Sequence, residues 1–427
     1  MISLMLFGLF VVLMLFSVPI AISLGLASTL TLLYSGKVSS SFIAQGLVTS
    51  IDSFPLMAVP FFILAGDLMS HGGLSQRLLN VGRILFGRYT GGLAIIAVVT
   101  CIFFAAISGS GPATVAAVGM ILLPAMAKEG YRPAFSSGLV ASAGSLGVII
   151  PPSIPMVIYA TSANVSVTKM FMAGIIPGLL VGLALIAYAW VEARRQGQTP
   201  TSERPTRREV LKTINDAKWA LLVPVIILGG IYGGIFTPTE AAAVGVVYGL
   251  VVGVFVYREV RLADLFHIFA RSALTSASIM LIVGTATIFG RVLAIERIPV
   301  MLAESITQMV SEPWVLLILV NILLLIIGTF METLAAIIIL TPILLPVVVA
   351  AGINPEHFGI VMIVNLAIGM VTPPVGVNLF VASRVGGLSL ESVARAATRP
   401  LVVLLLVLLI VTYVPAISLG LPALFGF

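Results

Sequence analysis

The chain has 427 residues, 60% of them hydrophobic and only 9% charged, and its formal net charge is +6. A soluble core of this size would need far more charge on its surface, so the composition excludes a soluble globular protein. Many apolar runs approach or exceed about 18 residues, the length that crosses a bilayer, which predicts an all-α polytopic membrane protein.

The first half of the chain, residues 1–191, opens with apolar segments that predict membrane helices. Residues 2–34 contain Pro19 near their middle and predict either one long bent helix or two short spans. A span at 52–70 follows, and residues 2–70 together supply the first scaffold helices. The stretch 71–91 interleaves Arg with Leu and Ile at a spacing that suits an interfacial amphipathic helix.

Two short apolar arms then flank the sequence Ser108-Gly109-Ser110-Gly111-Pro112. Each arm is too short to span the bilayer comfortably, so residues 92–127 predict a re-entrant helical hairpin. The next span, 134–160, is interrupted between Gly147 and Pro152, and a further span covers 171–191.

Residues 192–218 hold seven Lys or Arg and four acidic residues and form the one substantial hydrophilic linker. Residues 219–427 then repeat the plan of the first half. In chain order they predict scaffold helices within 219–290 (spans 219–236, 240–257 and 264–290), an amphipathic stretch 291–311, a second hairpin 313–350, a broken span 358–383 and a last span 400–423.

The two halves share a run of fixed positions, found at 121–152 and again at 343–374. Both runs read Ile-Leu-Leu-Pro, then Gly, Pro, Gly and Pro-Pro, at one constant offset of 222 residues without a gap. Apolar composition could match Ile and Leu by chance, but not four Pro and two Gly in register. The repeat therefore predicts an internal duplication with a Pro-broken helix in each half.

The predicted spans and the basic loops indicate that the two halves are inverted. Five full spans lie between the two hairpins, and an odd number reverses the orientation. Basic loops favour the cytoplasmic side. Placing 192–218 inside also places inside the loops Arg77–Arg88, Arg258–Arg261 and Arg384–Arg399, while only Arg291 and Arg297 fall on the wrong side. If 2–34 forms two spans, both termini are periplasmic.

The repeated breaks indicate a central transport site. Helices interrupted at corresponding positions of inverted repeats hold substrate and ions with their half-helix ends and unwound carbonyls. Pro and Gly are common in membrane helices generally. Two matching breaks, each paired with a hydroxyl-bearing hairpin tip, favour a site over that explanation.

Four motifs carry a resemblance to a known family: Ser108–Thr114, Gly147–Ser153, Gly328–Thr333 and Gly369–Pro374. Over essentially its whole length the chain resembles the large membrane (M) subunit of the tripartite ATP-independent periplasmic (TRAP) transporters, within the ion-transporter superfamily. The resemblance implies secondary uptake of an organic acid across the bacterial inner membrane by an elevator motion. The stretches 71–91 and 291–311 would be the arms that join the moving part to a scaffold of the remaining spans.

The same resemblance implies partners and ligands. A periplasmic substrate-binding protein (P type) would deliver the acid. A small four-helix membrane subunit (Q type) would be a separate chain, because no such segment precedes Met1. Two sodium ions are expected and no organic cofactor. The first ion site would comprise Ala105, Ser108, Gly147, Ile150 and Pro152, and the second Gly328, Gly369 and Thr372.

The acid is expected between the two hairpin tips, in contact with Ser110, Gly111, Thr114, Ser153, Thr333 and Asn378. Many Ser and Thr hydroxyls in membrane helices bond only their own or a neighbouring helix, so each of these residues could have a structural role instead of contacting the acid. C4-dicarboxylates, sugar acids, sialic acid and 2-oxo acids all suit hydroxyls and helix ends, and the sequence does not choose between them.

Charged residues within spans are candidates for function. Glu332 could bind a proton, assist a cation or cap the arm that begins at Thr333. Asp67 and Glu240 lie near span ends, where a helix-end role is expected. The three histidines, at 71, 267 and 357, form no ligand cluster, and the single Cys101 excludes a disulfide framework.

Three other functions fit the sequence less well. An intramembrane protease would need a Ser–His pair or two aspartates at depth, and neither pair is present in the spans. A channel fits paired inverted breaks less well than alternating access does. A stand-alone carboxylate:cation symporter of the same superfamily, which needs no binding protein, remains the nearest alternative.

Overall fold

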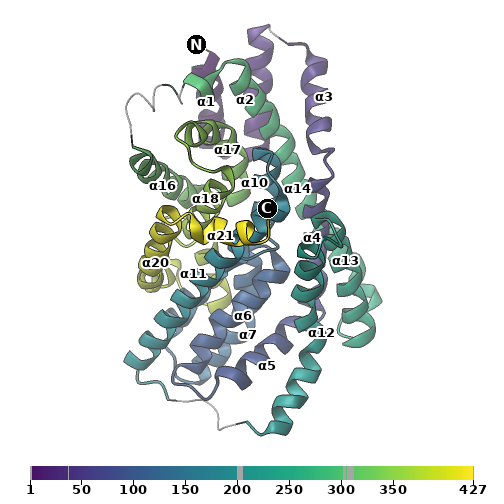
Figure 1. The fold of residues 1–427 in the computed structure, drawn as a ribbon, viewed down its shortest axis with the longest axis vertical. Coiled ribbons are helices and arrows are strands. Elements are labelled where there is room, and N and C mark those ends of the chain that lie inside the picture. The colour runs from purple at the N-terminus through teal and green to yellow at the C-terminus, as the bar shows by residue number, and fades with distance from the viewer. Residues whose placement is uncertain (1, 37, 200–204, 302–303, 305–311, 427) are drawn as a thin grey trace.

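The computed structural model describes residues 2–36, 38–199, 205–301, 304 and 312–426, and within them every regular element is a helix (Figure 1). The elements are α1 (Ile2–Leu15), α2 (Ile20–Ser35), α3 (Ser40–Ile51), η1 (Pro55–Met57), α4 (Ala58–His71), α5 (Leu74–Phe86), α6 (Gly92–Ser108), α7 (Gly111–Lys128), α8 (Pro133–Gly144), α9 (Leu146–Ile149), α10 (Ile154–Ala163), α11 (Val167–Arg195), α12 (Arg207–Tyr232), α13 (Pro238–Val251), η2 (Val252–Val256), α14 (Leu262–Ile295), α16 (Pro313–Phe330), α17 (Thr333–Ala350), α18 (Pro355–Gly369), α19 (Val377–Gly386), α20 (Leu390–Tyr413) and α21 (Ala416–Leu424).

The prediction of an all-α polytopic membrane fold is confirmed. Among the described residues, eight helices are long and apolar enough to cross a membrane, or up to ten if each bent helix pair forms one span. The choice left open for residues 2–34 is also settled, because α1 and α2 are separate helices. The chain reverses between them at Ser17, whose φ of +60° is left-handed, and at Pro19, which precedes α2.

The two hairpins and the two broken helices recur at the predicted spacing. The α6–α7 hairpin corresponds to α16–α17, and the α8–α10 segment corresponds to α18–α19. The helix α10 lies at 42° to the α8–α9 segment across the first Pro-Pro pair. Both Pro151–Pro152 and Pro373–Pro374 are joined by cis peptide bonds. Each half therefore contains a hairpin followed by an interrupted helix.

The helices pack as two groups, one of which contains both hairpins and both broken helices. The other group comprises α1–α4 and α12–α14, in which α14 packs on α2, α3 and α4, and α13 packs on α4. The helices α11 and α20 pack on the hairpin group, α11 on α6 and α18, and α20 on α8. The division of the spans into a moving part and a scaffold stays a prediction.

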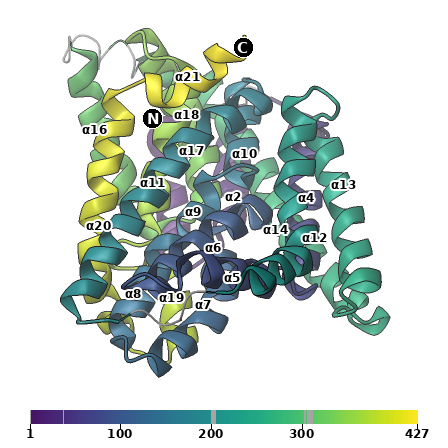
Figure 2. The same ribbon diagram turned by 60° about the horizontal axis from the view of Figure 1, so that its bottom comes forward.

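The amphipathic helix α5 lies between α6 and α12 in Figure 2 and contacts both groups, since it packs on each of these two helices. Its predicted counterpart at 291–311 is described only in part. The preceding helix α14 extends to Ile295, past the expected end of that span at 290, and residues 302–303 and 305–311 lie outside the described part.

Three predicted boundaries differ from the structure. The span predicted at 52–70 is preceded by an additional helix, α3, which meets the η1–α4 segment at 61°. The last span, predicted at 400–423, is instead α20 followed by the short helix α21, because Val414 and Pro415 interrupt the helix. The predicted linker 192–218 is largely helical at its ends, with α11 reaching Arg195 and α12 beginning at Arg207.

Candidate substrate and ion site

The first hairpin tip is a tight turn between α6 and α7. Gly109 ends α6 with a φ of +58°, a left-handed conformation that glycine adopts at little cost. The turn is held by hydroxyls: Ser108 Oγ lies 2.9 Å from Thr114 Oγ1 and accepts the Ser110 N–H at 3.4 Å. Thr114 in turn donates to the Ser110 carbonyl at 2.8 Å. Ser108 and Thr114 are both buried.

The first broken helix packs directly on this tip. A Cβ added to Gly147 would collide with the Ser110 carbonyl and lie 2.6 Å from Thr114 Oγ1. A Cβ added to Gly109 would lie 3.2 Å from the Pro152 carbonyl oxygen. The structure therefore brings together three residues predicted for the first ion site, Ser108, Gly147 and Pro152. The Ala105 carbonyl accepts the Gly109 N–H at 3.2 Å.

These groups offer oxygen alone, from hydroxyls and backbone carbonyls, which is the donor set that holds sodium at interrupted transporter helices. The fifth predicted residue is Ile150, which was predicted to contribute its carbonyl. It is the extended residue that ends α9, and its side chain faces Gly178 of α11.

The second tip is built differently. A Cβ added to Gly369 would lie 2.6 Å from the Gly328 Cα atom, so hairpin and broken helix meet backbone to backbone. Thr372, the third residue predicted here, lies beyond the end of α18 and donates its hydroxyl to the Ile368 carbonyl of that helix at 2.8 Å. Its N–H is donated to the Gly369 carbonyl at 3.0 Å. The second predicted ion site thus has fewer side-chain oxygens than the first, where the Ser108 and Thr114 hydroxyls lie together.

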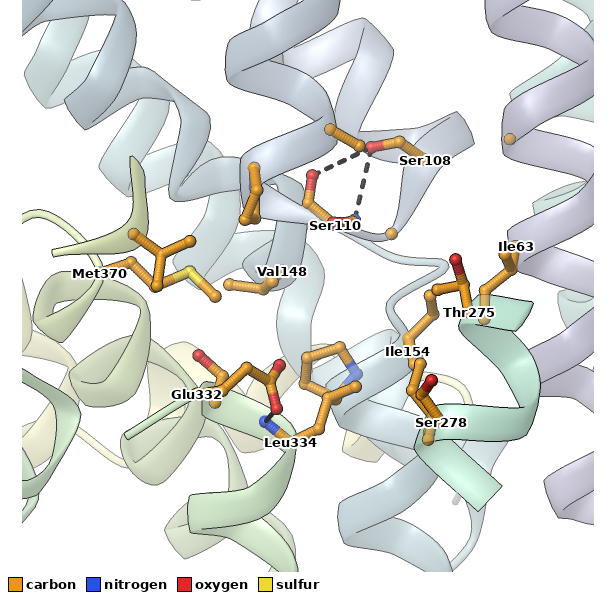
Figure 3. Close-up of a pocket in the computed structure, with 18 of the residues that line it drawn as sticks. Ile63, Ser108, Ser110, Val148, Ile154, Thr275, Ser278, Glu332, Leu334 and Met370 are labelled. Atoms are coloured by element: carbon orange, nitrogen blue, oxygen red, sulfur yellow. Dashed lines mark hydrogen bonds between the residues drawn. The ribbon is translucent and has the colours of Figure 1, made fainter. Parts of the chain in front are cut away.

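The two tips face one another across a cavity of about 500 Å³. In Figure 3 the Ser108–Ser110 turn enters this space from above and the Glu332–Leu334 segment from below. Of the residues predicted to contact the acid, Ser110 and Thr333 line the cavity. The other four lie behind its wall: Gly111, Thr114, Ser153 and Asn378.

Two of these predicted residues carry a buried polar atom without a hydrogen-bond partner among the described residues. They are Thr333, through its hydroxyl, and Asn378, through its Oδ1 atom. Asn378 Oδ1 would lie 3.2 Å from a Cβ added to Gly111, directly behind the first tip. Ser153, by contrast, has a structural role, because it donates to the Val148 carbonyl at 2.6 Å and caps α10.

The second group of helices, α1–α4 and α12–α14, supplies cavity residues that the sequence analysis did not assign to the site. Asp67 and Ser70 of α4 and Arg271 of α14 line the cavity opposite the tips. Asp67 is not merely a span-end residue, because its carboxylate accepts a hydrogen bond from Ser272 at 2.6 Å. The sequence did contain a signal for this part of the site, because Arg271 is a charged residue within the predicted membrane span 264–290. Glu240, in contrast, has the expected helix-end role and forms a capping box with Thr237.

A buried polar network behind the second broken helix was also missed. His357 bonds Ser418 Oγ at 2.7 Å and the Thr412 carbonyl at 3.1 Å. Asn321 donates to Thr412 Oγ1 at 3.1 Å and accepts from Asn365 at 2.8 Å. The network ties α18 to α16, α20 and α21, so this histidine holds helices together rather than ligating a metal.

Glu332 caps α17, which was one of its three predicted roles. Its carboxylate accepts the N–H groups of Leu334 and Ala335 at 3.1 and 3.2 Å. We expect Glu332→Ala to lower stability by about 1 kcal/mol, the usual cost of a lost N-cap, and Glu332→Gln to lower it less. Ion dependence of transport should stay unchanged in both. Thermal unfolding of the purified variants and ion titrations of uptake measure these effects, and altered ion dependence in Glu332→Gln would instead place the carboxylate in coupling.

Comparisons with known proteins agree with this architecture. Residues 7–417 match the family model described as the tripartite ATP-independent periplasmic transporter, DctM component. The chain is 51% identical over 412 residues to an isethionate TRAP transporter permease protein of Oleidesulfovibrio alaskensis, covering 96% of this chain and 65% of that relative's length. It is 48% identical over 400 residues to a C4-dicarboxylate TRAP transporter large permease protein of Pseudomonas aeruginosa, covering 94% and 93% of the two chains.

A solved structure shares the fold. The YdaH transporter of Alcanivorax borkumensis superposes with a TM-score of 0.65 over 89% of each chain, at 16% sequence identity. At that identity the likeness concerns the fold alone.

Proposed function

The chain belongs to the DctM family, the large permease component of tripartite ATP-independent periplasmic transporters, and we propose that it imports an organic acid together with sodium ions. The observation that carries the proposal is the cavity between the two tips, which each broken helix approaches from behind its own hairpin. Multi-pass insertion in the bacterial inner membrane, with both termini periplasmic, is part of the same proposal.

The first tip is the better place for the acid group of the substrate. No side chain caps α7, whose first turn reaches the cavity through Ser110 and Ala113. Uncapped N–H groups and the positive end of the helix dipole attract an anion. The start of α17 is already capped by the Glu332 carboxyl group, which accepts the Leu334 and Ala335 N–H groups. The carboxylate or sulfonate should therefore approach α7, while Thr333 contacts a polar part of the substrate.

Sodium ions would be carried as co-substrates. At the first site they would meet the Ser108 hydroxyl and the carbonyls around Gly147 and Pro152, and at the second the backbone around Gly328 and Gly369. Such oxygen ligands coordinate a sodium ion without a carboxylate. The predicted Ala105, Ile150 and Thr372 carbonyls remain candidates for the remaining ligands.

An elevator motion is the proposed mechanism. The hairpin group would slide as a unit against α1–α4 and α12–α14, with α5 as one connecting arm. Two features support this. The cavity lies at the boundary of the two groups, and Gly66 of α4 lets the first tip approach closely, since an added Cβ would lie 3.3 Å from the Ser108 Cα atom.

The proposal includes the two partners expected for a three-part transporter, a Q-type small membrane subunit and a P-type periplasmic binding protein. The named TRAP permeases among the relatives favour it over a stand-alone symporter. Isethionate, C4-dicarboxylates and sialic acid form the first panel of acids, the first two because these relatives are named for them.

The test is uptake by proteoliposomes that contain both membrane subunits, with and without the binding protein outside. We expect saturable uptake of one acid from the panel only when the binding protein is present. Uptake that is equally fast without it would favour the stand-alone symporter, and flux that does not saturate would indicate a pore.

A further inference from the structure

The cavity between the tips contains one unused positive charge. Three charged residues line it among those the structure describes: Asp67, Arg271 and Glu332. Asp67 is bonded to Ser272, and Glu332 caps α17. Arg271 has an exposed side chain and forms neither an ion pair nor a hydrogen bond through that side chain with any described residue. Its guanidinium therefore has five N–H donors available to a ligand in the cavity.

Arg271 belongs to a stripe on α14 that faces the tips. The cavity-lining residues of this helix are Arg271, Thr275, Ser278, Ile279 and Ile282, which share one helical face. Figure 3 shows Thr275 and Ser278 of this stripe across the cavity from Glu332 and Met370. Their hydroxyls are occupied, since Thr275 donates to the Arg271 carbonyl at 3.0 Å and Ser278 to the Leu274 carbonyl at 2.9 Å. Arg271 is thus the free donor of the stripe.

Arg271 also lies between the cavity at the tips and a second, smaller cavity. A second cavity of about 230 Å³ shares Asp67, Ser70, Ala113 and Arg271 with the first. Its other walls are the outer part of α7, from Ala116 to Ile121, and the junction of α4 with α5 at His71 and Ser75. Together the cavities lead from the tips toward the basic helix α5, on the predicted cytoplasmic face.

We propose that Arg271 binds the acid group of the substrate on its way from the hairpin tips to the cytoplasm. This inference rests on the proposed function. A guanidinium pairs with a carboxylate or sulfonate through two parallel N–H bonds. Because Arg271 lies on the scaffold and the tips lie on the moving group, it meets the substrate only when the tips are beside it. Arg271 therefore determines the affinity for acid on the cytoplasmic side, and other groups bind the acid on the periplasmic side.

The test is exchange in proteoliposomes that contain both membrane subunits. Isethionate and succinate serve as probes, one a sulfonate and the other a dicarboxylate. Binding protein added outside selects the transporters whose periplasmic face is outward. We expect Arg271→Gln to raise the half-saturating internal concentration by about tenfold or more, the effect of losing a charge-assisted hydrogen bond. The external half-saturating concentration should change less than about twofold, and Arg271→Lys should restore part of the internal affinity.

Arg291→Gln is the matched control. Arg291 lies on the same helix, away from the cavity, with its guanidinium 5.3 Å from the Phe42 ring. This variant should exchange both probes as the unmodified protein does. If Arg271→Gln does not assemble, Arg271→Lys is measured alone and must still weaken internal affinity.

Three outcomes separate the claims. Unchanged internal affinity in the Arg271 variants, with active exchange by the unmodified protein, would overturn this inference and leave the proposed function intact. A defect that occurs only in vesicles containing phosphatidylglycerol would assign Arg271 to a lipid headgroup and also overturn it. Absence of acid exchange in the unmodified assembly would count against the proposed function itself.

Discussion

Replacing Gly369 by Ala is expected to reduce uptake by about 100-fold or more. The added Cβ would lie 2.6 Å from both the Cα and the carbonyl carbon of Gly328, and no rotamer change can relieve a contact with backbone. The second hairpin must then move off its broken helix. A displacement of about 1 Å at a binding site can cost about 100-fold in rate. Initial uptake rates of the reconstituted assembly measure the effect.

Gly229→Ala is the matched control for this variant. Gly229 also lies within a helix, α12, but a Cβ there would meet nothing within 4 Å. Alanine is a better helix former than glycine, so this variant should keep full activity and gain up to about 1 kcal/mol of stability. Both variants should purify as folded protein. Near-normal uptake by Gly369→Ala would show that the close Gly328–Gly369 contact is not needed for transport.

Replacing Ser108 by Ala is expected to weaken sodium binding strongly. The Ser108 hydroxyl is buried at the first tip, bonded to Thr114, and accepts the Ser110 N–H. Its loss removes one proposed ion ligand and loosens the turn that positions the others. We expect the half-saturating sodium concentration for uptake to rise by about tenfold or more, in line with a lost hydrogen bond to a charged group. Sodium titrations of uptake at saturating acid measure it.

Ser142→Ala tests whether any buried serine would have the same effect. Ser142 of α8 is buried and donates to the Gly138 carbonyl of its own helix at 2.8 Å. Its loss should leave the sodium dependence unchanged. If Ser108→Ala and Ser142→Ala shift the sodium titration equally, or if neither does, the first ion site is not at the first tip.

The parts of the fold that the sequence predicted correctly are those with strong local chemistry. The Pro-Pro pairs repeated at an offset of 222 residues mark both broken helices, because two adjacent prolines remove two helical N–H donors, and the repeated Gly369 permits close backbone contact with Gly328. The single repeated prolines Pro124 and Pro346 lie inside α7 and α17 and do not end these helices. The helix α3 was missed because its sequence, SSFIAQGLVTSI, is short and carries polar residues that resemble a loop. Pro415 indicates the end of α20, but it lies within a long apolar run that was predicted as one continuous span.

The candidate site was predicted less completely, since a cavity depends on which distant helices meet. The tips were located from Ser108, Ser110 and Thr333. The sequence did not show which side chains reach the cavity, and Thr114 and Asn378 lie behind the cavity wall. Arg271 joins the site through the packing of α14 beside the tips, a contact that no local pattern encodes. The same holds for His357, whose partners Thr412 and Ser418 are 55 and 61 residues away.

The most direct test of sodium-coupled import is uptake under one imposed gradient at a time. Proteoliposomes with both membrane subunits, and the binding protein outside, receive either an inward sodium gradient or an inward proton gradient. We predict saturable accumulation of the acid with the sodium gradient and none when that gradient is removed. Accumulation driven by the proton gradient in the absence of sodium would contradict the proposed coupling.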